Sequence, residues 1–425
     1  MFNLTIKNKN IFYFNVINIL VVSFVFIMYL NKLNTTNFFF IENYTINNKI
    51  LNTIFTLMIF TLLLISFINK QILYTNIYVS LIYFLFCLTL FFLTFTNSIL
   101  IFFVAYEFLL LFTSIIVYFF SPNIRSKVIT FYFVIWTQLS SFFLWLTIIY
   151  VFYKTNSFDI NYLNVLLFDK SNSKLLSYLV FISFCIKLPL WPFSFWLIKT
   201  HVEANTSFSI FLSGVLVKTA LLGLLKFNFI LHNNNNVLFS YIIIFSACVS
   251  TFNLNYQTDF KKLIAFTTIQ EMSIISLYLF FNSYINTQLI LYFIILHTLI
   301  SFFLFFLNDL IYIRFKTRKT NLHLGMMVVT PKLSLLLIIV WFLFVSLPLT
   351  LKFFFELLFL FKILSLNTII CITVIICLQY LTIIFFTKNV ITYIFGNGNK
   401  FSNDISKNEM LLSFIILFLF ALIVT

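Results

Sequence analysis

Charged residues are scarce in this sequence, and their scarcity determines the class of protein. Only 9% of the 425 residues are Asp, Glu, Lys or Arg, whereas 62% are hydrophobic and the mean hydropathy is +1.08. Roughly a quarter of the residues in a soluble domain are charged, because most of its surface faces water. The composition therefore excludes a soluble domain and predicts a polytopic membrane protein.

Cysteine, glycine and proline are also rare, with five of each. All five cysteines lie in apolar stretches and none forms a CxxC pair, which argues against a disulfide framework, a metal site or an iron–sulfur cluster. The chain also lacks a GxGxxG motif, so a dinucleotide-binding fold is not expected. We therefore expect no cofactor and no redox centre in this chain.

Phenylalanine, by contrast, occupies 64 positions, and Ile, Leu, Asn, Lys and Tyr are abundant. These residues have AT-rich codons, whereas the scarce glycine and proline have GC-rich ones. The composition therefore indicates an AT-rich organellar genome. A chain made inside an organelle needs no cleavable targeting segment, and we expect none before the first apolar run.

The apolar residues form runs that are long enough to cross a membrane. A bilayer core of about 30 Å needs roughly 20 apolar residues per helix, which gives about thirteen spans. The runs are continuous rather than alternating, so the fold is expected to be all-α and not a β-barrel. The run at 331–362 is too long to be a straight helix. The spans are expected near 11–30, 51–68, 74–95, 98–120, 127–153, 175–198, 207–230, 237–254, 261–281, 285–311, 331–362, 366–387 and 410–425.

The Lys and Arg residues are divided unevenly between alternate loops. Of the 26 in the chain, sixteen fall on one face of the membrane, seven on the other and three inside spans. Because basic loops are retained on the side from which the chain inserts, the N-terminus is expected on that side and the C-terminus on the opposite side. The net charge of +15 is then mostly topological, and no nucleic-acid partner is expected.

Six ionisable residues lie inside the apolar runs, where a charge costs about 2.5–3.5 kcal/mol or more. Such residues commonly face a protein interior or a hydrated cavity and serve ion pathways. The alternative is a set of structural ion pairs between helices, but six residues in five spans favour a relay. They are Glu107, Lys187, Lys218, His297, Lys352 and Glu356.

The first three of these residues lie in the first half of the chain. Lys187 precedes Pro189 and Pro192, which each lack a backbone N–H, so the helix is predicted to break just after the lysine. Broken helices at mid-membrane are a recurrent device for ion sites in transporters. Lys218 lies in the following span, where a buried lysine can both accept and release a proton. Glu107 has no charge one turn away and needs a partner from another helix.

The second half repeats this pattern. Pro348 interrupts the long run, and Lys352 and Glu356 follow it one turn apart, where they can neutralise each other. His297 lies in another span, and a neutral imidazole can relay a proton through its two nitrogens. A proline-broken span in both halves predicts an internal repeat of the transporter type. The single membrane domain, 1–425, is expected to comprise a first repeat, a second inverted repeat and a C-terminal part, approximately at 74–230, 237–387 and 388–425.

The residues around these charges resemble the signature of the antiporter-like subunits of respiratory complex I. Recognisable motifs run from about 100 to 362. Glu356 falls eight residues after Pro348, where the subunit-4 branch of the family carries a glutamate and the subunit-2 and subunit-5 branches typically carry a lysine. The other motifs are KLPLWPFSFWLIKTHVEANTSFSIFLSGVLVKTALLGLLKF at 187–227, QTDFKKLIAFTTIQEM at 257–272, the pair Tyr106 and Glu107, and the His297 helix with Tyr312 and Arg314.

The resemblance implies a fold and a set of roles. It implies two inverted five-helix repeats, each with a broken helix. It also implies that Glu107 and Lys187 act as a coupled pair, Lys218 as the central relay, His297 as a linking relay and Glu356 as the terminal proton residue.

The same resemblance implies a function, which is proton translocation in the membrane arm of NADH:ubiquinone oxidoreductase, coupled to quinone reduction elsewhere in the complex. The expected location is the mitochondrial inner membrane, with the N-terminus on the matrix side and the C-terminus on the intermembrane-space side. Expected partners are other membrane-arm subunits, notably the homologous subunits 2 and 5, and lipids. FMN and iron–sulfur clusters are expected in partner subunits.

The chain departs from the family pattern at several points. Glu271 stands where the family usually has a histidine, and Asn205 replaces the proline usual after HVEA. The span of Glu107 is the fourth rather than the fifth, so one N-terminal helix is expected to be missing or supplied by another chain. His201 and Glu203 mark a helix entrance, where they serve either a capping loop or direct proton transfer.

Two other functions remain open at this point. A free-standing cation/proton antiporter shares the same repeat and would act without NADH-oxidising partners. A structural membrane subunit would retain the buried charges as vestiges.

Overall fold

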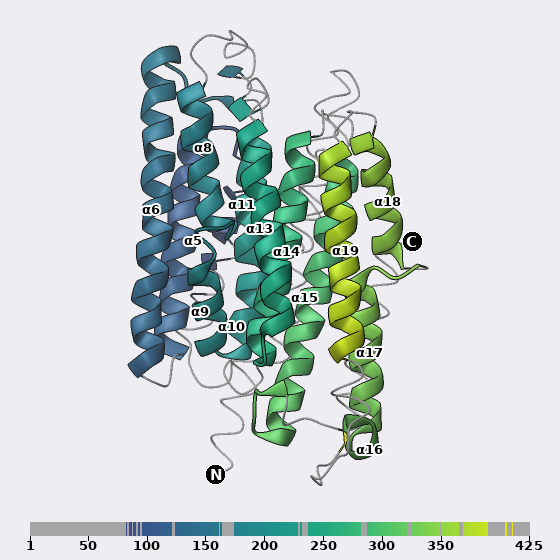
Figure 1. Ribbon diagram of the computed structural model, residues 1–425. Coiled ribbons are helices and arrows are strands. Elements are labelled where there is room, and N and C mark those ends of the chain that lie inside the picture. Colours follow the sequence, from purple (N-terminus) through teal and green to yellow (C-terminus); the bar gives the residue numbers. More distant parts are fainter. Residues whose placement is uncertain are drawn as a thin grey trace, which may run out of the picture. The chain divides into compact units, whose positions relative to one another are not determined.

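The computed structural model of the protein is helical throughout the part of the chain that it describes (Figure 1). It describes 96–389 with gaps at 121–123, 161, 164–173, 228–229, 232–236, 282–286, 321–324, 349 and 365–368, together with isolated residues between 82 and 93 and residues 404, 405 and 410. The expected spans at 11–30 and 51–68, and most of those at 74–95 and 410–425, lie outside the described residues. Within the described ranges there is no strand, and two isolated backbone bridges join Ser98 to Asp159 and Asp259 to Lys319.

The chain divides into two compact units, which are considered separately. The first comprises 1–187, 203–211 and 215–235, and the second comprises 188–202, 212–214 and 236–425. The helices are, in chain order, α5 Ile99–Phe120, α6 Ile124–Thr155, α8 Lys174–Lys187, α9 Phe195–Glu203, α10 Thr206–Phe211, the π-helical segment η1 Leu212–Leu216, α11 Val217–Lys226, α13 Val237–Tyr256, α14 Phe260–Phe281, α15 Thr287–Phe315, α16 Met326–Val329, α17 Pro331–Val345, α18 Leu351–Leu364 and α19 Ile369–Asn389.

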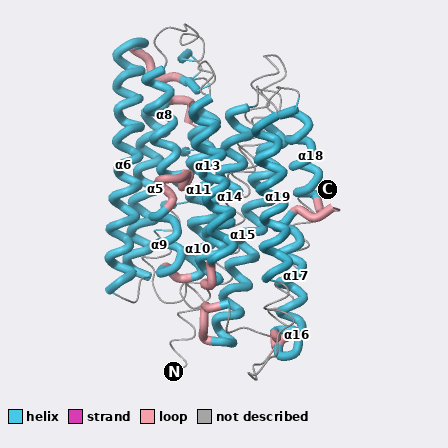
Figure 2. The backbone as a smooth tube through the Cα atoms, in the orientation of Figure 1, coloured by secondary structure: helices cyan, strands magenta, loops and turns pink. Residues whose placement is uncertain are grey.

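Both predicted helix breaks are confirmed. Helix α8 ends at Lys187, and the chain stays non-helical through 188–194 before α9 begins at Phe195, as the pink segment between α8 and α9 in Figure 2 shows. Helix α17 ends at Val345 and α18 begins at Leu351, with Pro348 between them. In both places a proline removes the N–H that would continue the helix.

Five stretches of the described residues are long and apolar enough to cross a membrane, and each overlaps a predicted span. They are Ile99–Tyr118, Lys127–Thr155, Phe208–Lys226, Leu238–Tyr256 and Phe293–Phe315. The total of about thirteen spans and the two inverted repeats stay predictions.

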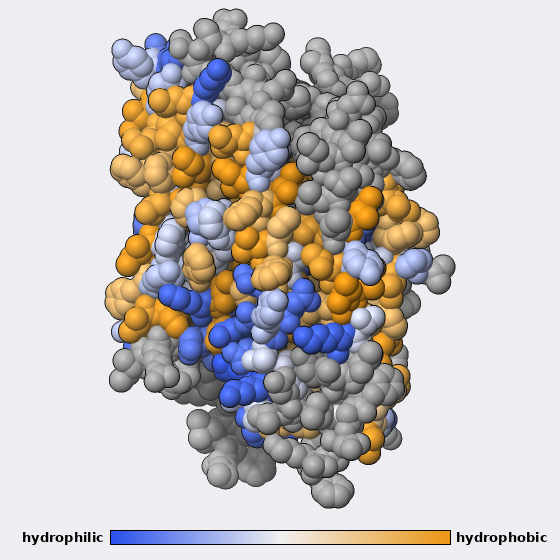
Figure 3. Space-filling view, viewed as in Figure 1, coloured by the Kyte–Doolittle hydropathy of each residue, from blue (hydrophilic) through white to orange (hydrophobic). Residues whose placement is uncertain are grey.

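Helix α6 has the surface expected of a helix that faces lipid. Large apolar side chains at Val128, Phe131, Ile135 and Phe142 are 59–64% exposed along its length. Figure 3 shows hydrophobic residues over most of this helix. These side chains are exposed in the described part of the chain, as expected for a helix that faces lipid.

Close packing inside the first unit depends on one glycine. A Cβ added to Gly223 on α11 would lie 2.1 Å from Phe184 Cε1 on α8, so only glycine permits this approach of the two helices. Small residues serve the same purpose in membrane helix pairs generally, because van der Waals contact replaces the hydrophobic effect there. The buried hydroxyls need no partner helix, since Thr113, Ser183 and Thr219 each donate to the carbonyl three residues earlier.

Candidate functional site

Lys187 is held in the first unit by an aromatic ring rather than by an anion. Its side chain is buried, and Nζ lies 3.2 Å from the ring centroid of Tyr106 on α5. Within the described residues Nζ has no hydrogen-bond partner. A cation over an aromatic face is attracted by about 0.5–2 kcal/mol, which is weaker than a buried ion pair.

Tyr106 belongs to a closed cluster of four aromatic rings. The centroid distances are 5.5 Å from Phe102 to Tyr106, 6.4 Å from Tyr106 to Phe184, 5.6 Å from Phe184 to Phe227 and 5.9 Å from Phe227 to Phe102. These rings come from α5, α8 and the residue after α11. The cluster joins the helix that carries Glu107 to the helices that carry Lys187 and Lys218.

Lys226 lies against the same aromatic cluster, a position that the amino-acid sequence did not predict. The charge pattern assigned Lys226 to a membrane face, but Nζ lies 5.3 Å from the Phe102 ring centroid and donates hydrogen bonds of 2.8 Å to the carbonyls of Leu93 and Thr96. Both carbonyls belong to residues shortly before α5, so Lys226 ties the end of α11 to the chain that leads into α5. Lys261, also counted among the loop residues, is buried in the second unit.

Glu107 has the partner on another helix that its isolation predicted. Gln138 Nε2 on α6 donates a 3.1 Å hydrogen bond to Glu107 Oε2. The other carboxyl oxygen is buried without a hydrogen-bond partner in the described part of the chain. The expected partner Lys187 makes no ion pair with Glu107 there, since it contacts the ring of the adjacent Tyr106 instead. The coupling of Glu107 and Lys187 therefore stays a prediction.

Lys218 is buried and is the second residue of α11. Helix α11 directly follows η1, five residues of π-helix with the sequence LSGVL, so Lys218 lies two residues beyond the end of η1. Single π-helical turns inside α-helices occur often at functional sites, because they shift the register of the side chains beyond them. The sequence predicted that Lys218 lies in the middle of a regular helix. Apart from the small residues Ser213 and Gly214, no feature of the sequence indicated the π-helical segment.

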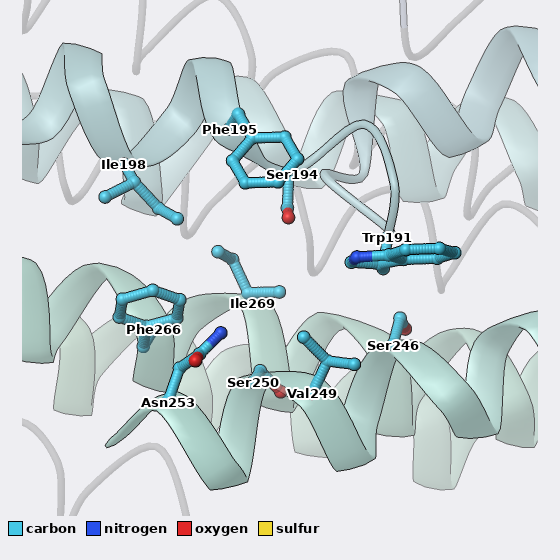
Figure 4. Close-up of a pocket in the computed structure, with 10 residues that line it drawn as sticks. All are labelled: Trp191, Ser194, Phe195, Ile198, Ser246, Val249, Ser250, Asn253, Phe266 and Ile269. Atoms are coloured by element: carbon cyan, nitrogen blue, oxygen red, sulfur yellow. The ribbon is translucent and has the colours of Figure 1, made fainter. Parts of the chain in front are cut away.

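A cavity of about 150 Å³ lies beside the broken segment 188–194 in the second unit. Figure 4 shows side chains of the broken segment and α9 facing side chains of α13 and α14 across it. The space is large enough for several water molecules, and serine and asparagine side chains offer them partners. The lining residues are Trp191, Ser194, Phe195, Ile198, Ser246, Val249, Ser250, Asn253, Phe266 and Ile269.

Lys352 lies at the centre of a buried ionic cluster in the second unit. Its Nζ lies 2.5 Å from Glu271 Oε1 on α14 and 3.7 Å from Glu356 Oε1 on its own helix. The sequence predicted the pair with Glu356 but not the closer pair with Glu271, which α14 contributes from 81 residues away. In the sequence, Glu271 stands out only as a departure from the family pattern.

The helix break explains the third contact of Lys352. In a continuous helix the Phe344 carbonyl would accept the N–H of residue 348, but that residue is proline and has no N–H. Lys352 Nζ donates to this carbonyl instead. The proline thus creates the acceptor that fixes the lysine at the break.

Glu356 is buried and has two further contacts. Ser346 Oγ lies 2.5 Å from Glu356 Oε2, and Gln379 Nε2 on α19 donates a 2.8 Å hydrogen bond to the same oxygen. Ser346 is the first residue after α17 and has a left-handed backbone, with φ of 55°. The break therefore supplies both the serine and the lysine that surround this carboxyl.

Two of the four histidines, His201 and His297, are buried in the second unit. His297 lies on α15, which packs against α14 and α18, the helices of the ionic cluster. His201 stacks on Phe305 at 4.9 Å between ring centroids, and so it is a packed side chain as well as part of the HVEA motif. Within the described residues no group of three or more His, Cys, Asp or Glu side chains is arranged to hold a metal ion.

Comparisons with known proteins identify the family of the chain. Residues 96–382 match the family model described as NADH:quinone oxidoreductase/Mrp antiporter, TM. "NADH-ubiquinone oxidoreductase chain 4" of Paramecium tetraurelia is 35% identical over 67% of this chain and 61% of its own length. "NADH-quinone oxidoreductase subunit M" of Rickettsia typhi is 28% identical over 53% of this chain and 47% of its own length. The chain thus spans about half to three fifths of these relatives.

Solved structures share the fold. A chain in the structure titled "Respiratory complex I from Thermus thermophilus with bound NADH" superposes with a TM-score of 0.76 at 18% identity, over 86% of this chain and 79% of that one. A chain of the Mrp complex from Dietzia sp. superposes with a TM-score of 0.71 at 15% identity, over 83% and 67% respectively. The fold is therefore that of the polytopic antiporter-like subunits. With two thirds of its residues matched by the family model, the chain belongs to the NADH:quinone oxidoreductase/Mrp antiporter transmembrane family.

Proposed function

We propose that this chain is a proton-translocating subunit of the membrane arm of an NADH:ubiquinone oxidoreductase, where it couples quinone reduction elsewhere in the complex to proton pumping. The observation that carries the proposal is the set of buried ionisable residues beside two proline-broken helices, in a chain of the antiporter family. Ionisable residues inside membrane helices are costly and typically mark proton pathways. The names of the matched relatives supply the oxidoreductase part of the proposal.

The same relatives and the charge pattern of the loops support the setting that we propose. The chain lies in the mitochondrial inner membrane, with its N-terminus on the matrix side and its C-terminus on the intermembrane-space side. Its partners are other membrane-arm subunits, including the homologous subunits 2 and 5, and lipids. FMN and iron–sulfur clusters belong to partner subunits, and this chain carries no redox centre.

The proposed mechanism is electrostatic. A conformational change in a neighbouring subunit shifts Lys187 relative to Glu107, which is feasible because Lys187 is held by a ring and by no hydrogen bond in the described residues. The shift changes the field at Lys218, and with it the proton affinity of that lysine. The proton then passes by way of His297 to Glu356 and leaves.

Substitution of two relay residues tests this function. We expect Lys218→Ala and Glu107→Gln each to abolish proton pumping by the assembled complex while the complex still forms. The matched control is Lys262→Ala, because Lys262 is a half-exposed lysine paired with Asp259 near the start of α14. Wild-type pumping and coupled oxidase activity in both relay variants would contradict the proposal.

A free-standing cation/proton antiporter is the second candidate, and the fold shared with the Mrp complex supports it. It predicts that the chain purifies without NADH-oxidising subunits and exchanges cations for protons by itself. Co-purification with a large oxidoreductase would exclude it. A structural subunit with vestigial charges predicts instead that Lys218→Ala changes no transport activity.

A further inference from the structure

Three ionisable side chains from two helices meet in the interior of the second unit. Glu271 lies on α14, while Lys352 and Glu356 lie on α18, and they are 2%, 4% and 5% exposed. The cluster thus holds two carboxyl groups and one ammonium group. If all three were ionised, an uncompensated negative charge would be buried in an apolar interior, which is strongly unfavourable.

A single bound proton removes this excess charge. Two carboxyl groups that share one cation and one buried site retain a proton between them, since both cannot ionise at little cost. The protonation state of lowest free energy is then one ammonium, one carboxylate and one carboxylic acid. The distances around the cluster indicate which of the two glutamates carries the proton.

Glu271 has the contacts of the carboxylate. Lys352 Nζ lies 2.5 Å from its Oε1, so the ammonium group contacts this oxygen directly. The distance from Nζ to Glu356 Oε1, 3.7 Å, is too long for a hydrogen bond.

The contacts of Glu356 accommodate the acid form. Ser346 Oγ lies 2.5 Å from Glu356 Oε2 and 2.6 Å from the carbonyl oxygen of Val345. A hydroxyl has only one proton to donate. When Ser346 donates that proton to the Val345 carbonyl, its short contact with Glu356 requires a proton on the carboxyl group.

We propose that Glu271 and Glu356 share one proton, and that the ammonium group of Lys352 moves from one carboxyl to the other as the proton moves in the opposite direction. When Nζ shifts from Glu271 to Glu356, the O–H bond at Glu356 breaks and an O–H bond forms at Glu271. Lys352 keeps its three protons, so the cluster stays neutral in both states. Glu271 is therefore a second proton-binding residue of the chain.

The surroundings of Lys352 suit such a movement. Lys352 Nζ donates one of its three protons to the Phe344 carbonyl, which Pro348 leaves without a backbone donor. The other two protons are available to the carboxyl groups. Nζ already lies within 4 Å of both carboxyl groups, so the movement is short. Tyr278 on α14 is a further titratable group, and it lies within electrostatic range of both Glu271 and Glu356. Gln379 holds Glu356 in place by its hydrogen bond.

This inference rests on the proposed function only for the direction of net flow, in which the reverse exchange returns the proton from Glu271 to Glu356 and Glu356 then releases it. Proton sharing itself is tested by infrared spectroscopy of the membrane complex that contains the full chain. We expect the wild type to show a carboxylic-acid C=O band that is absent from Glu356→Gln. We also expect Glu271→Gln to lose this band, because Lys352 then pairs with Glu356 alone. A band that survives in Glu271→Gln, or is missing from the wild type, overturns proton sharing.

Proton pumping by the double variant Glu271→Gln/Lys352→Met tests the exchange. This variant removes an ammonium and a carboxylate together, so the cluster stays neutral. If Lys352 exchanges between the carboxyl groups, pumping falls at least tenfold while the complex assembles. If Glu271 and Lys352 form only a static ion pair, the double variant pumps at the wild-type rate, and the exchange is refuted. Loss of pumping in Lys218→Ala together with normal pumping in the double variant would refute the exchange but leave the proposed function intact.

Discussion

In the span broken at 188–194 the lysine precedes the prolines and lies against an aromatic ring, whereas in the span broken at 346–350 the lysine follows the proline and lies between two carboxyl groups. Lys187 has no hydrogen-bond partner in the described residues, while Lys352 donates to Glu271 and to the Phe344 carbonyl. The same sequence device, a proline beside a buried lysine, therefore produces two different electrostatic environments. The first lysine is loosely held, and the second is part of a neutral cluster.

The difference follows from where the proline stands relative to the lysine. Pro348 stands four residues before Lys352, so the carbonyl that it leaves without a donor lies within reach of that lysine. Pro189 and Pro192 follow Lys187. The carbonyls that these prolines leave without donors, four residues before each, belong to Cys185 in α8 and to Leu188 in the break. Lys187 is left with the face of Tyr106.

The largest expected effect on stability is that of Lys352→Met. Removing the cation leaves two buried carboxyl groups without a counter-ion, and breaking a buried ion pair on one side costs about 3–5 kcal/mol. The free energy of unfolding, measured for the full chain in a denaturing-detergent titration, should fall by that amount. The double variant Glu271→Gln/Lys352→Met should recover most of it. Equal stabilities of the single and double variants would show that the cluster is not coupled.

Gly223→Ala should have the next largest effect, and it tests how tightly the helices around Lys187 and Lys218 pack. The new methyl group would lie 2.1 Å from the Phe184 ring, which must move. Overpacking of this kind costs about 1–3 kcal/mol. The same titration measures it, and Phe184→Leu in the same chain should relieve most of the loss. No change in Gly223→Ala would mean that α8 and α11 lie farther apart than described.

Gln138→Leu should have a smaller effect and tests the environment of Glu107. The substitution removes the 3.1 Å hydrogen bond to Glu107 Oε2 and replaces the amide by an apolar side chain of similar size on the surface of α6. A hydrogen bond of this kind contributes about 0.5–1.5 kcal/mol, and we expect a loss within that range. Gln138→Glu, which places a like charge beside Glu107, is the more severe comparison. A variant as stable as the wild type would show that Glu107 has another partner.

Lys187→Met should change stability least, in contrast to Lys352→Met. The attraction to the Tyr106 ring, about 0.5–2 kcal/mol, is offset by the desolvation penalty that methionine does not incur. We expect a net change within about 1 kcal/mol, which detergent titration can resolve. A loss as large as that of Lys352→Met would erase the difference between the two breaks.

The local part of this architecture could be predicted from the sequence, because its causes are local. Pro189, Pro192 and Pro348 lack an N–H wherever they stand, so both breaks could be placed within a few residues. The burial of Lys187, Lys218, His297 and Glu356 followed from the apolar residues around them.

The non-local part could not be predicted, because it depends on which helices pack together. The pair of Glu271 and Lys352 joins residues 81 positions apart, and the sequence gives no register for α14 against α18. Gln138 as the partner of Glu107 and Lys226 as the donor to the Leu93 and Thr96 carbonyls depend on packing in the same way. The π-helical turn before Lys218 is a small deviation from a regular helix that no residue pattern marks.

The most direct test of the central claim, that the buried lysine at the first helix break moves protons rather than holds helices together, is proton pumping by the Lys187→Met complex measured together with its assembly and stability. The account predicts an assembled complex with near wild-type stability and at least a tenfold loss of proton translocation per electron. Normal translocation in that complex, or a loss of pumping only in step with a loss of assembly, would contradict it.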